Sequence, residues 1–294
     1  MNNMRTNSPT GQRRGGLRWW VIILFGAYAA WYWFSNQTDA AFTGRSQLID
    51  STVEEEAQMG LQAYRQILSE SNVVTGGQLP SQMQLMANRL VAVGPRVEAD
   101  LAAERGVKPS IQWDAFNWQV SVIESDQANA FCLPGGKIAV YTGIIPVAQN
   151  ESALAAIMGH EIAHALLRHS GERMAQQKLV QLSSMAAGMA VGDMEPQQQR
   201  AVMAVMGAGA QYGVLLPFSR DHESEADEVG LMLAAAACYD PREAIGLWER
   251  MGKLSSGQAP PEFMSTHPSG TTRIAHLQSL MPKALEIRKA YCGQ

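Results

Sequence analysis

The sequence predicts an α+β fold that is mostly helical, with a small β-sheet next to a central helix. The chain has 294 residues, of which 46% are hydrophobic, enough to build one large domain with a core. Residues 111–124 alternate in polarity and are rich in Trp, Phe and Val, which indicates a strand. Residues 151–168 are rich in alanine and leucine, lack proline and follow Asn150, a good N-cap, which indicates a helix.

The chain begins with a basic segment followed by an apolar run. Residues 1–18 contain four arginines and no acidic residue, and residues 19–35 carry no charge and have aromatic residues at both ends. We interpret residues 19–35 as a transmembrane signal-anchor, residues 1–18 as a cytoplasmic N-terminus and residues 36–50 as a linker. The alternative is a signal peptide that is cleaved near residues 38–40. Both interpretations export the rest of the chain.

Residues 51–294 are expected to form the main domain. Ser51 and Glu54 make a capping box that opens a helix to about residue 70, and Ser81–Val93 indicates a second helix. Two further strands are expected, followed later by two C-terminal helices. The expected strands are residues 130–133 and 137–141, and the helices run from about residue 240 to 251 and from about 271, with a loop at 257–268.

An apolar helical insert is expected at about residues 183–216, which contain many Met, Ala and Gly and very few charges. Methionine fills irregular gaps, so this stretch is typical of a helical hairpin packed on the core. The alternative is an apolar flap over a cleft, or a surface that contacts a membrane or an unfolded protein. Of the three cysteines, Cys238 and Cys292 are the candidate pair in an exported protein, which leaves Cys132; the alternative is three buried thiols.

The most informative motif is His160-Glu161-Ile162-Ala163-His164, within the expected helix at 151–168. Residues four apart lie on one helix face, so His160 and His164 can reach the same metal ion. Glu161 lies about 100° further round and can address a water molecule on that metal without becoming a ligand. Zinc lowers the pKa of a bound water molecule to ~7, and the carboxylate can then take the proton. The alternative is a chance pattern on a solvated helix.

The third ligand is sought in the acidic cluster at residues 219–227, which opens another helix. A catalytic zinc ion usually has three protein ligands. Glu223 and Asp227 share a helix face, which suits a ligand and a partner that orients a histidine. His222 is a rival ligand, and an acidic helix start that stabilises the helix dipole is the alternative explanation of the charges.

Three neighbouring residues are expected to lie outside the metal site. His169 follows His164 by five residues and lies about 140° away around the helix, so we expect a surface residue or one that forms hydrogen bonds between helices, rather than a ligand. Glu225 and Glu228 point away from the face of Glu223 and are expected to be solvated.

A small sheet before the metal-binding helix is typical of zincins, and its edge strand can bind the substrate backbone by β-addition.

Taken together, these motifs resemble the gluzincin metallopeptidases, the family that includes HtpX, BepA and the CAAX prenyl endopeptidases. The resemblance covers about residues 44–277 and is strongest with the BepA-like and mitochondrial Oma-like members, without the C-terminal helical repeats of BepA. The matching segments outside the two helix motifs are Asn129-Ala130-Phe131, Leu133-Pro134-Gly135-Gly136, Tyr141-Thr142-Gly143, Thr266-His267-Pro268 and Arg273-Ile274.

The resemblance implies a zincin-like fold and one zinc ion per chain, held by His160, His164 and Glu223. It implies that Glu161 acts as general base and acid. It also implies that the loop with His267 approaches the zinc, where this histidine can fill the open coordination position or stabilise the oxyanion. The residues that it implies for substrate binding are Asn129, Ala130, Phe131 and Arg273.

The predicted function is that of a membrane-tethered zinc metalloendopeptidase in protein quality control. Its expected substrates are misfolded or unassembled envelope proteins, and its expected location is the bacterial inner membrane, with one span and the catalytic domain in the periplasm. The alternatives are a tethered chaperone or assembly factor with little proteolysis, an amidase acting on cell-wall peptides, and a domain secreted to the periplasm. The net charge of −4 does not favour a nucleic-acid partner.

Overall fold

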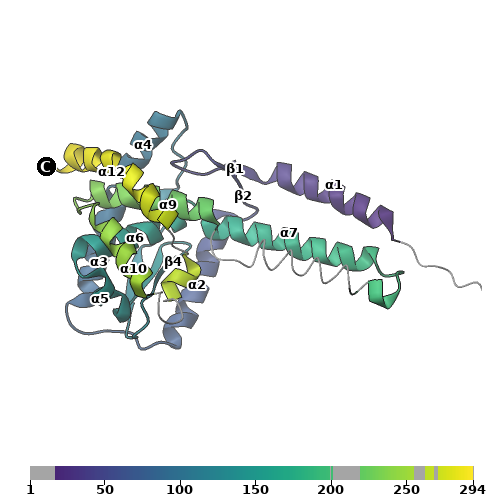
Figure 1. The fold of residues 1–294 in the computed structure, drawn as a ribbon, viewed down its shortest axis with the longest axis horizontal. Coiled ribbons are helices and arrows are strands. Elements are labelled where there is room, and N and C mark those ends of the chain that lie inside the picture. Colours follow the sequence, from purple (N-terminus) through teal and green to yellow (C-terminus); the bar gives the residue numbers. More distant parts are fainter. Residues whose placement is uncertain (1–16, 199, 201–218, 255–261, 268–270, 294) are drawn as a thin grey trace, which may run out of the picture. The chain divides into compact units, whose positions relative to one another are not determined.

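The computed structural model describes residues 17–198, 200, 219–254, 262–267 and 271–293. Helices dominate it and the sheets are small, so the predicted α+β class is confirmed (Figure 1). The chain divides into two compact units. The first comprises Met1–Ser35 and Gln176–Leu216, and the second comprises Asn36–Ala175 and Pro217–Gln294.

The first unit consists of α1 (Trp19–Ser35) and the part of α7 (His169–Ala190) that follows Gln176. Three buried side chains join them: Val21, Ala186 and Ala190. None of the helices in the described part of the chain combines the length and the apolar character that a membrane crossing requires.

The apolar insert expected at residues 183–216 is described only in part. Its first residues continue α7 as a helix, and Met185 and Met189 on that helix are exposed. Residues 199 and 201–218 lie outside the described residues. Whether the insert forms a hairpin or a flap therefore stays a prediction.

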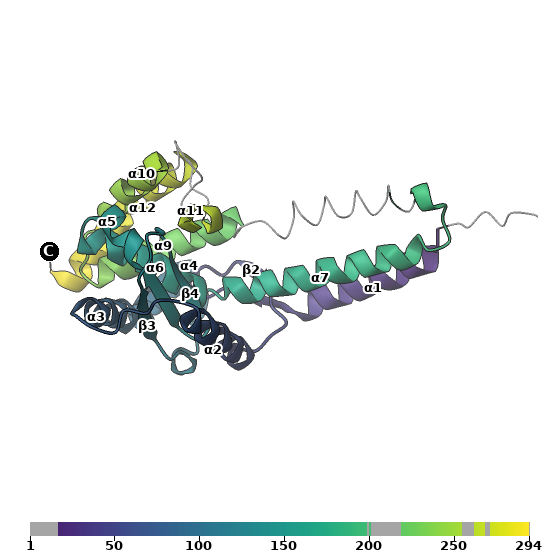
Figure 2. The ribbon, with the colours of Figure 1, turned by 90° about the horizontal axis from the view of Figure 1, so that it is seen from below.

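The second unit is built on a three-stranded sheet with the order β3-β5-β4. Figure 2 labels β3 and β4 beside α6. The strands are β3 (Gln119–Ile123), β4 (Ala130–Leu133) and β5 (Lys137–Tyr141). β3 runs parallel to β5, and β4 runs antiparallel to it, so β4 is an edge strand. Both short strands predicted from the sequence are confirmed, whereas the strand predicted at 111–124 is shorter and follows a 3-10 turn, η1 (Trp113–Ala115).

Side-chain alternation gives the sheet two apolar faces. On one face Val122, Ile138 and Cys132 join the main core together with α6 (Glu151–Leu166). On the other face a smaller cluster forms around Tyr64, a residue of α2 (Val53–Ser69). The metal-binding helix and the edge strand therefore lie against each other on the main-core face of the sheet.

The remaining elements surround this centre. The short ones are β1 (Gln37–Asp39), β2 (Ser46–Leu48), η2 (Thr142–Ile144), α5 (Ile145–Ala148) and α11 (Glu262–Thr266). The longer helices are α2 (Val53–Ser69), α3 (Leu79–Ala92), α4 (Gly94–Arg105), α9 (Arg220–Ala236), α10 (Glu243–Leu254) and α12 (Thr271–Cys292).

Several local expectations need correction. The capping box of α2 lies one residue later than expected, at Thr52 and Glu55, because the backbone of Thr52 is extended and its hydroxyl accepts from the Glu55 amide. The segment expected as a linker at 36–50 forms the β1–β2 hairpin, and its Phe42 is fully buried. The loop expected at 257–268 contains α11.

Glycine lets the two helices of the predicted metal site approach closely. A Cβ atom on Gly230 of α9 would lie 2.6 Å from the backbone nitrogen of His160 on α6, and one on Gly159 would lie 2.7 Å from the Gly230 carbonyl oxygen. At the far end of α9, Cys238 forms a disulfide with Cys292 at the end of α12. The predicted pairing is thus confirmed, and Cys132 is a buried free thiol.

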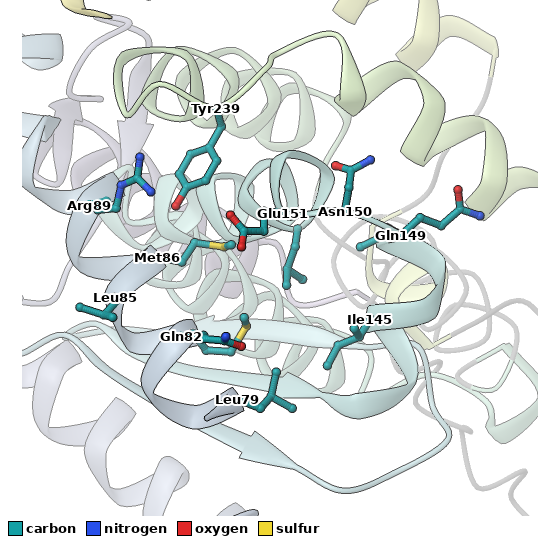
Figure 3. A pocket seen from close by; sticks show the side chains of 13 residues that line it. Leu79, Gln82, Leu85, Met86, Arg89, Ile145, Gln149, Asn150, Glu151 and Tyr239 are labelled. Atoms are coloured by element: carbon teal, nitrogen blue, oxygen red, sulfur yellow. The ribbon is translucent and has the colours of Figure 1, made fainter. Parts of the chain in front are cut away.

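A cavity of about 390 Å³ lies between α3, α5 and the start of α6 (Figure 3). Its wall is mainly apolar, and Glu151 and the ring of Tyr239 line it. The histidines of the sequence motif and Glu223 are not among its lining residues, so this cavity is separate from the metal site.

Candidate metal centre

The two motif histidines lie on α6, which begins at the predicted N-cap: the Asn150 side chain accepts a hydrogen bond from the Ala153 amide. Helical spacing brings His160 and His164 together, with 3.0 Å between their Nε2 atoms. Both side chains are buried. Because their Nε2 atoms face the same point, the proton of each neutral ring belongs on Nδ1 when Nε2 binds a metal.

Glu223 reaches the same point from α9, whose N-cap is Ser219. Its Oε2 lies 3.4 Å from His160 Nε2, and its Oε1 lies 3.4 Å from His164 Nε2. Burial acts to raise the pKa of this carboxyl, but the surrounding histidines outweigh burial and hold the pKa far below its usual range. Glu223 therefore carries a negative charge towards the two imidazoles.

His267 completes the cluster. Its Nδ1 lies 2.9 Å from Glu223 Oε1 and 3.3 Å from His160 Nε2, and the side chain is buried. One ligand atom from each of four residues, His160, His164, Glu223 and His267, lies within 4.8 Å of the others. Imidazole nitrogens with one carboxylate oxygen are a donor set that suits zinc, so these residues fit the metal.

Glu161 lies beside this cluster and faces the edge strand. One carboxylate oxygen accepts a hydrogen bond from the Cys132 backbone amide at 3.3 Å, and the other lies 3.4 Å from His267 Nε2. Burial raises the pKa of Glu161 to about 7. A group that exchanges protons works best when its pKa is near the working pH, so this carboxyl suits a general base and acid.

A second layer of charged residues supports His160 and Glu223. His160 Nδ1 lies 3.0 Å from an oxygen of Asp227, the arrangement that fixes a ligand histidine in one tautomer. Arg273 donates to Glu223 at 2.7 Å and to Asp227 at 2.6 Å, and its guanidinium group lies over the ring of Trp248. Arg273 is buried and connects the two acids.

A further polar network lies behind His164. His164 Nδ1 is 2.8 Å from His169 Nδ1, and His169 Nε2 is 3.2 Å from Glu225. Burial lowers the pKa of His169 to about 4. His222 lies in this network, with its Nε2 2.9 Å from Glu172, and it is not part of the metal cluster.

Two expectations about the acidic residues of α9 were wrong. Glu225 is buried, because Arg45 and His169 hold its carboxylate on the inner side of the helix. Glu228 forms an ion pair with Arg105 of α4. The sequence offered no signal for these pairs, because both arginines lie more than 120 residues from their acids.

Three of the residues expected to bind substrate lie on or next to the edge strand β4, and the fourth, Arg273, is the buried arginine of α12. Ala130 and Phe131 belong to the edge strand β4, and the carbonyl of Asn129 accepts a hydrogen bond from the Tyr141 amide. The ring of Phe131 packs on the face of the sheet opposite α6, 6.2 Å from the ring of Tyr141. The structure thus brings the strand backbone, rather than these side chains, towards Glu161.

Two buried histidines on α6, a glutamate from α9 and a second carboxylate beside an edge strand define a zinc metalloendopeptidase. The comparison with protein families agrees with this class. The description "Peptidase family M48" matches residues 96–281, and the chain belongs to this family.

Its relatives include mitochondrial and bacterial proteases. The chain is 34% identical over 269 residues to the mitochondrial metalloendopeptidase OMA1 of Schizosaccharomyces pombe, covering 90% of this chain and 72% of that protein. It is 30% identical over 283 residues to the Saccharomyces cerevisiae protein of the same name, covering 92% and 76%. It is 26% identical over 228 residues to the beta-barrel assembly-enhancing protease of Yersinia pestis, covering 76% and 43%.

Proposed function

We propose that His160, His164 and Glu223 hold the zinc ion and that Glu161 is the general base and acid of peptide-bond hydrolysis. Zinc, when bound, supplies a water nucleophile of lowered pKa. Glu161 takes a proton from the nucleophile and delivers it to the leaving amine. The observation that carries this proposal is the position of Glu161, between the ligand cluster and the backbone amide of Cys132.

The edge strand β4 is proposed to bind the substrate backbone. In the antiparallel ladder with β5, residues that exchange backbone hydrogen bonds alternate with residues that do not. The Tyr141 amide donates to the Asn129 carbonyl and the Cys132 amide donates to Glu161, so the backbone polar groups of Ala130 and Cys132 point away from β5. An extended peptide can add to such an edge by main-chain hydrogen bonds, which select little for side chains. This mode suits misfolded or unassembled proteins that expose extended segments.

The test is a comparison of two glutamates on the same helix. Glu161→Gln is expected to abolish casein cleavage while zinc stoichiometry stays near one per chain, because a glutamine can neither take nor deliver the proton. Glu151→Gln, at an exposed position in the first turn of α6, is the matched control and is expected to keep full activity. Full activity of Glu161→Gln would refute the assignment.

We also propose that His267 is a latch that keeps the enzyme inactive. A catalytic zinc site keeps an open position, and a fourth protein ligand closes it. His267 directly follows α11, and α11 contacts the segment that precedes the edge strand, where the Phe263 amide donates to the Ala128 carbonyl at 3.4 Å. The Phe263 ring lies 4.7 Å from that of His267, so both would move together.

Replacement of the latch tests this proposal. His267→Ala is expected to raise the rate of casein cleavage at saturating substrate, because one zinc position is then free. His276→Ala, at a half-buried histidine on α12 outside the metal cluster, is the control and is expected to cleave at the wild-type rate. A lower rate in His267→Ala would assign this residue to the transition state instead.

The proposed location is a bacterial envelope, with α1 tethering the peptidase to the inner membrane. The basic residues before α1 and its exposed aromatic and aliphatic side chains support this tether, among them Trp19, Trp20 and Phe34. The proposed role is quality control of exported proteins. Fractionation of cells tests it: the full chain should sediment with membranes and resist salt, and a chain beginning at Asn36 should not.

A further inference from the structure

The network behind His164 has one arrangement of protons that is compatible with metal binding. His164 presents Nε2 to Glu223 and His160, so its proton lies on Nδ1. That proton points at His169 Nδ1, 2.8 Å away, which must then accept it. His169 therefore carries its own proton on Nε2, on the opposite side of its ring.

Glu225 accepts the hydrogen bond that this Nε2–H group of His169 donates. Its Oε2 lies 3.2 Å from His169 Nε2, so the chain of donors runs from His164 through His169 to a carboxylate. His160 has the shorter version of this arrangement, with Asp227 3.0 Å from its Nδ1. Both histidines thus end on a buried acid, one directly and one through a second imidazole.

Arg45 holds this acid in place from the β1–β2 hairpin. Its Nε donates to Glu225 at 2.8 Å, and its two terminal nitrogens donate to the carboxylate of Glu172 at 3.0 and 2.7 Å. Thr43 of the same hairpin donates to the other oxygen of Glu225 at 2.5 Å. Both oxygen atoms of Glu225 are therefore held by the β1–β2 hairpin, within the residues 36–50 that were expected to be a linker.

The ring of His169 is also fixed from its face. His222 stacks on it, with 4.4 Å between the ring centroids and 22° between the planes. His222 Nε2 in turn lies 2.9 Å from Glu172, the second acid that Arg45 binds. Arg45 thus bridges the acid that hydrogen-bonds His169 and the acid that holds the ring stacked on it.

We propose that His169 and Glu225, clamped by Arg45, are positioning residues that fix the tautomer and the ring orientation of the zinc ligand His164. The β1–β2 hairpin then contributes directly to the strength of zinc binding. The inference rests on the proposed ligand set. Loss of such a partner typically weakens metal affinity by roughly 10–100-fold.

Two substitutions of His169 separate a hydrogen-bonding role from a packing role. His169→Asn places an amide oxygen where Nδ1 lies and keeps an acceptor for His164, but it loses the ring. His169→Phe keeps the ring stacked on His222 and loses the acceptor. His169→Asn also loses the bond to Glu225, because its amide does not reach as far as Nε2. We expect zinc release to a chromogenic chelator to be roughly tenfold faster than wild type in His169→Asn and roughly 100-fold faster in His169→Phe. The opposite order would overturn the proposal.

Arg45→Ala tests the clamp without altering the histidines. The matched control is Arg105→Ala, because Arg45 and Arg105 side chains are both 27% exposed and both pair with a glutamate of α9. Zinc release is expected to be roughly tenfold faster in Arg45→Ala and unchanged in Arg105→Ala, with the thermal midpoints of the two metal-free variants compared alongside. Equal release from the two variants would overturn the clamp.

His164→Ala distinguishes failure of this inference from failure of the proposed ligand set. If His164→Ala loses zinc while His169→Phe releases it at the wild-type rate, the positioning role is wrong and the ligand set stands. If His164→Ala keeps its zinc with wild-type affinity, the ligand set is wrong, and the role of His169 is refuted with it.

Discussion

The substitution Gly230→Ala tests whether the metal site depends on the close crossing of α6 and α9. The added Cβ would lie 2.6 Å from the backbone nitrogen of His160 and 2.7 Å from the carbonyl carbon of Gly159. Non-bonded carbon atoms prefer about 3.5 Å or more, so the helices must separate by roughly 0.8 Å. No side-chain rotation can relieve the contact, because backbone atoms form it.

Two opposing terms set the expected loss of stability. Overpacking of a tight contact costs about 1–3 kcal/mol, and we expect the upper end because the obstacle is backbone. Replacing glycine by alanine within a helix returns about 1 kcal/mol. Gly230→Ala should therefore lower the free energy of unfolding of the metal-free protein by about 2 kcal/mol.

Zinc binding should weaken as well. Gly230 is two helical turns from Glu223 on α9, and it faces the backbone beside His160 on α6. A separation of roughly 0.8 Å exceeds the ~0.5 Å within which a functional site must be held. Zinc affinity should fall at least about tenfold, measured by competition with a chelator, and urea unfolding of the metal-free protein should report the stability change.

Gly252→Ala is the matched control. Gly252 lies in α10, and a Cβ there meets nothing within 4 Å. This variant should gain about 0.5–1 kcal/mol and bind zinc as wild type does. The reasoning is refuted if Gly230→Ala is as stable as Gly252→Ala, or if it binds zinc with wild-type affinity.

Three further outcomes are expected. Glu223→Ala should lose zinc, whereas Asp227→Ala should bind it roughly 10–100-fold more weakly, as measured by chelator competition, and the reverse ranking would contradict the ligand assignment. Burial acts to raise the pKa of Glu172, but its histidine and arginine partners lower it from 4.5 to about 2, so its stabilisation is present above pH ~4.5 and is lost as the pH falls towards 2. Glu172→Gln should thus be about 1–3 kcal/mol less stable than wild type at pH 7, with a difference in urea unfolding that shrinks from pH 5 to pH 3; a constant difference would contradict this origin. Replacing Cys238 and Cys292 by serine removes a cross-link between residues 54 apart and should cost about 3–4 kcal/mol in unfolding, with zinc stoichiometry unchanged; unaltered stability under reducing conditions would argue against the disulfide.

The sequence alone determined the features that local geometry fixes. The 3.6-residue period of the helix puts His160 and His164 on one face, whatever the rest of the chain does. The short side chain of Asn150, which suits a helix N-cap, predicted the start of α6, and this cap is confirmed. The acidic cluster at residues 219–227 predicted the helix that is α9. The two short strands predicted at residues 130–133 and 137–141 are β4 and β5, with the same bounds. Where two neighbouring caps were chemically equivalent, as at Ser51 and Thr52, sequence could not choose between them.

Only the tertiary structure decided which distant residues support the ligands. His169 lies 56 residues from Glu225, and Arg45 lies 180 residues from it, so no local period relates them. Their meeting depends on how closely α6 and α9 cross, which Gly159 and Gly230 permit. Glu225 was expected in solvent because the sequence shows only its position around the helix. The β1–β2 hairpin that binds Glu225 through Thr43 and Arg45 cannot be placed from the sequence. Whether a helix residue such as Glu225 is buried depends on which distant segments pack against it, so the sequence of the helix alone could not predict its burial.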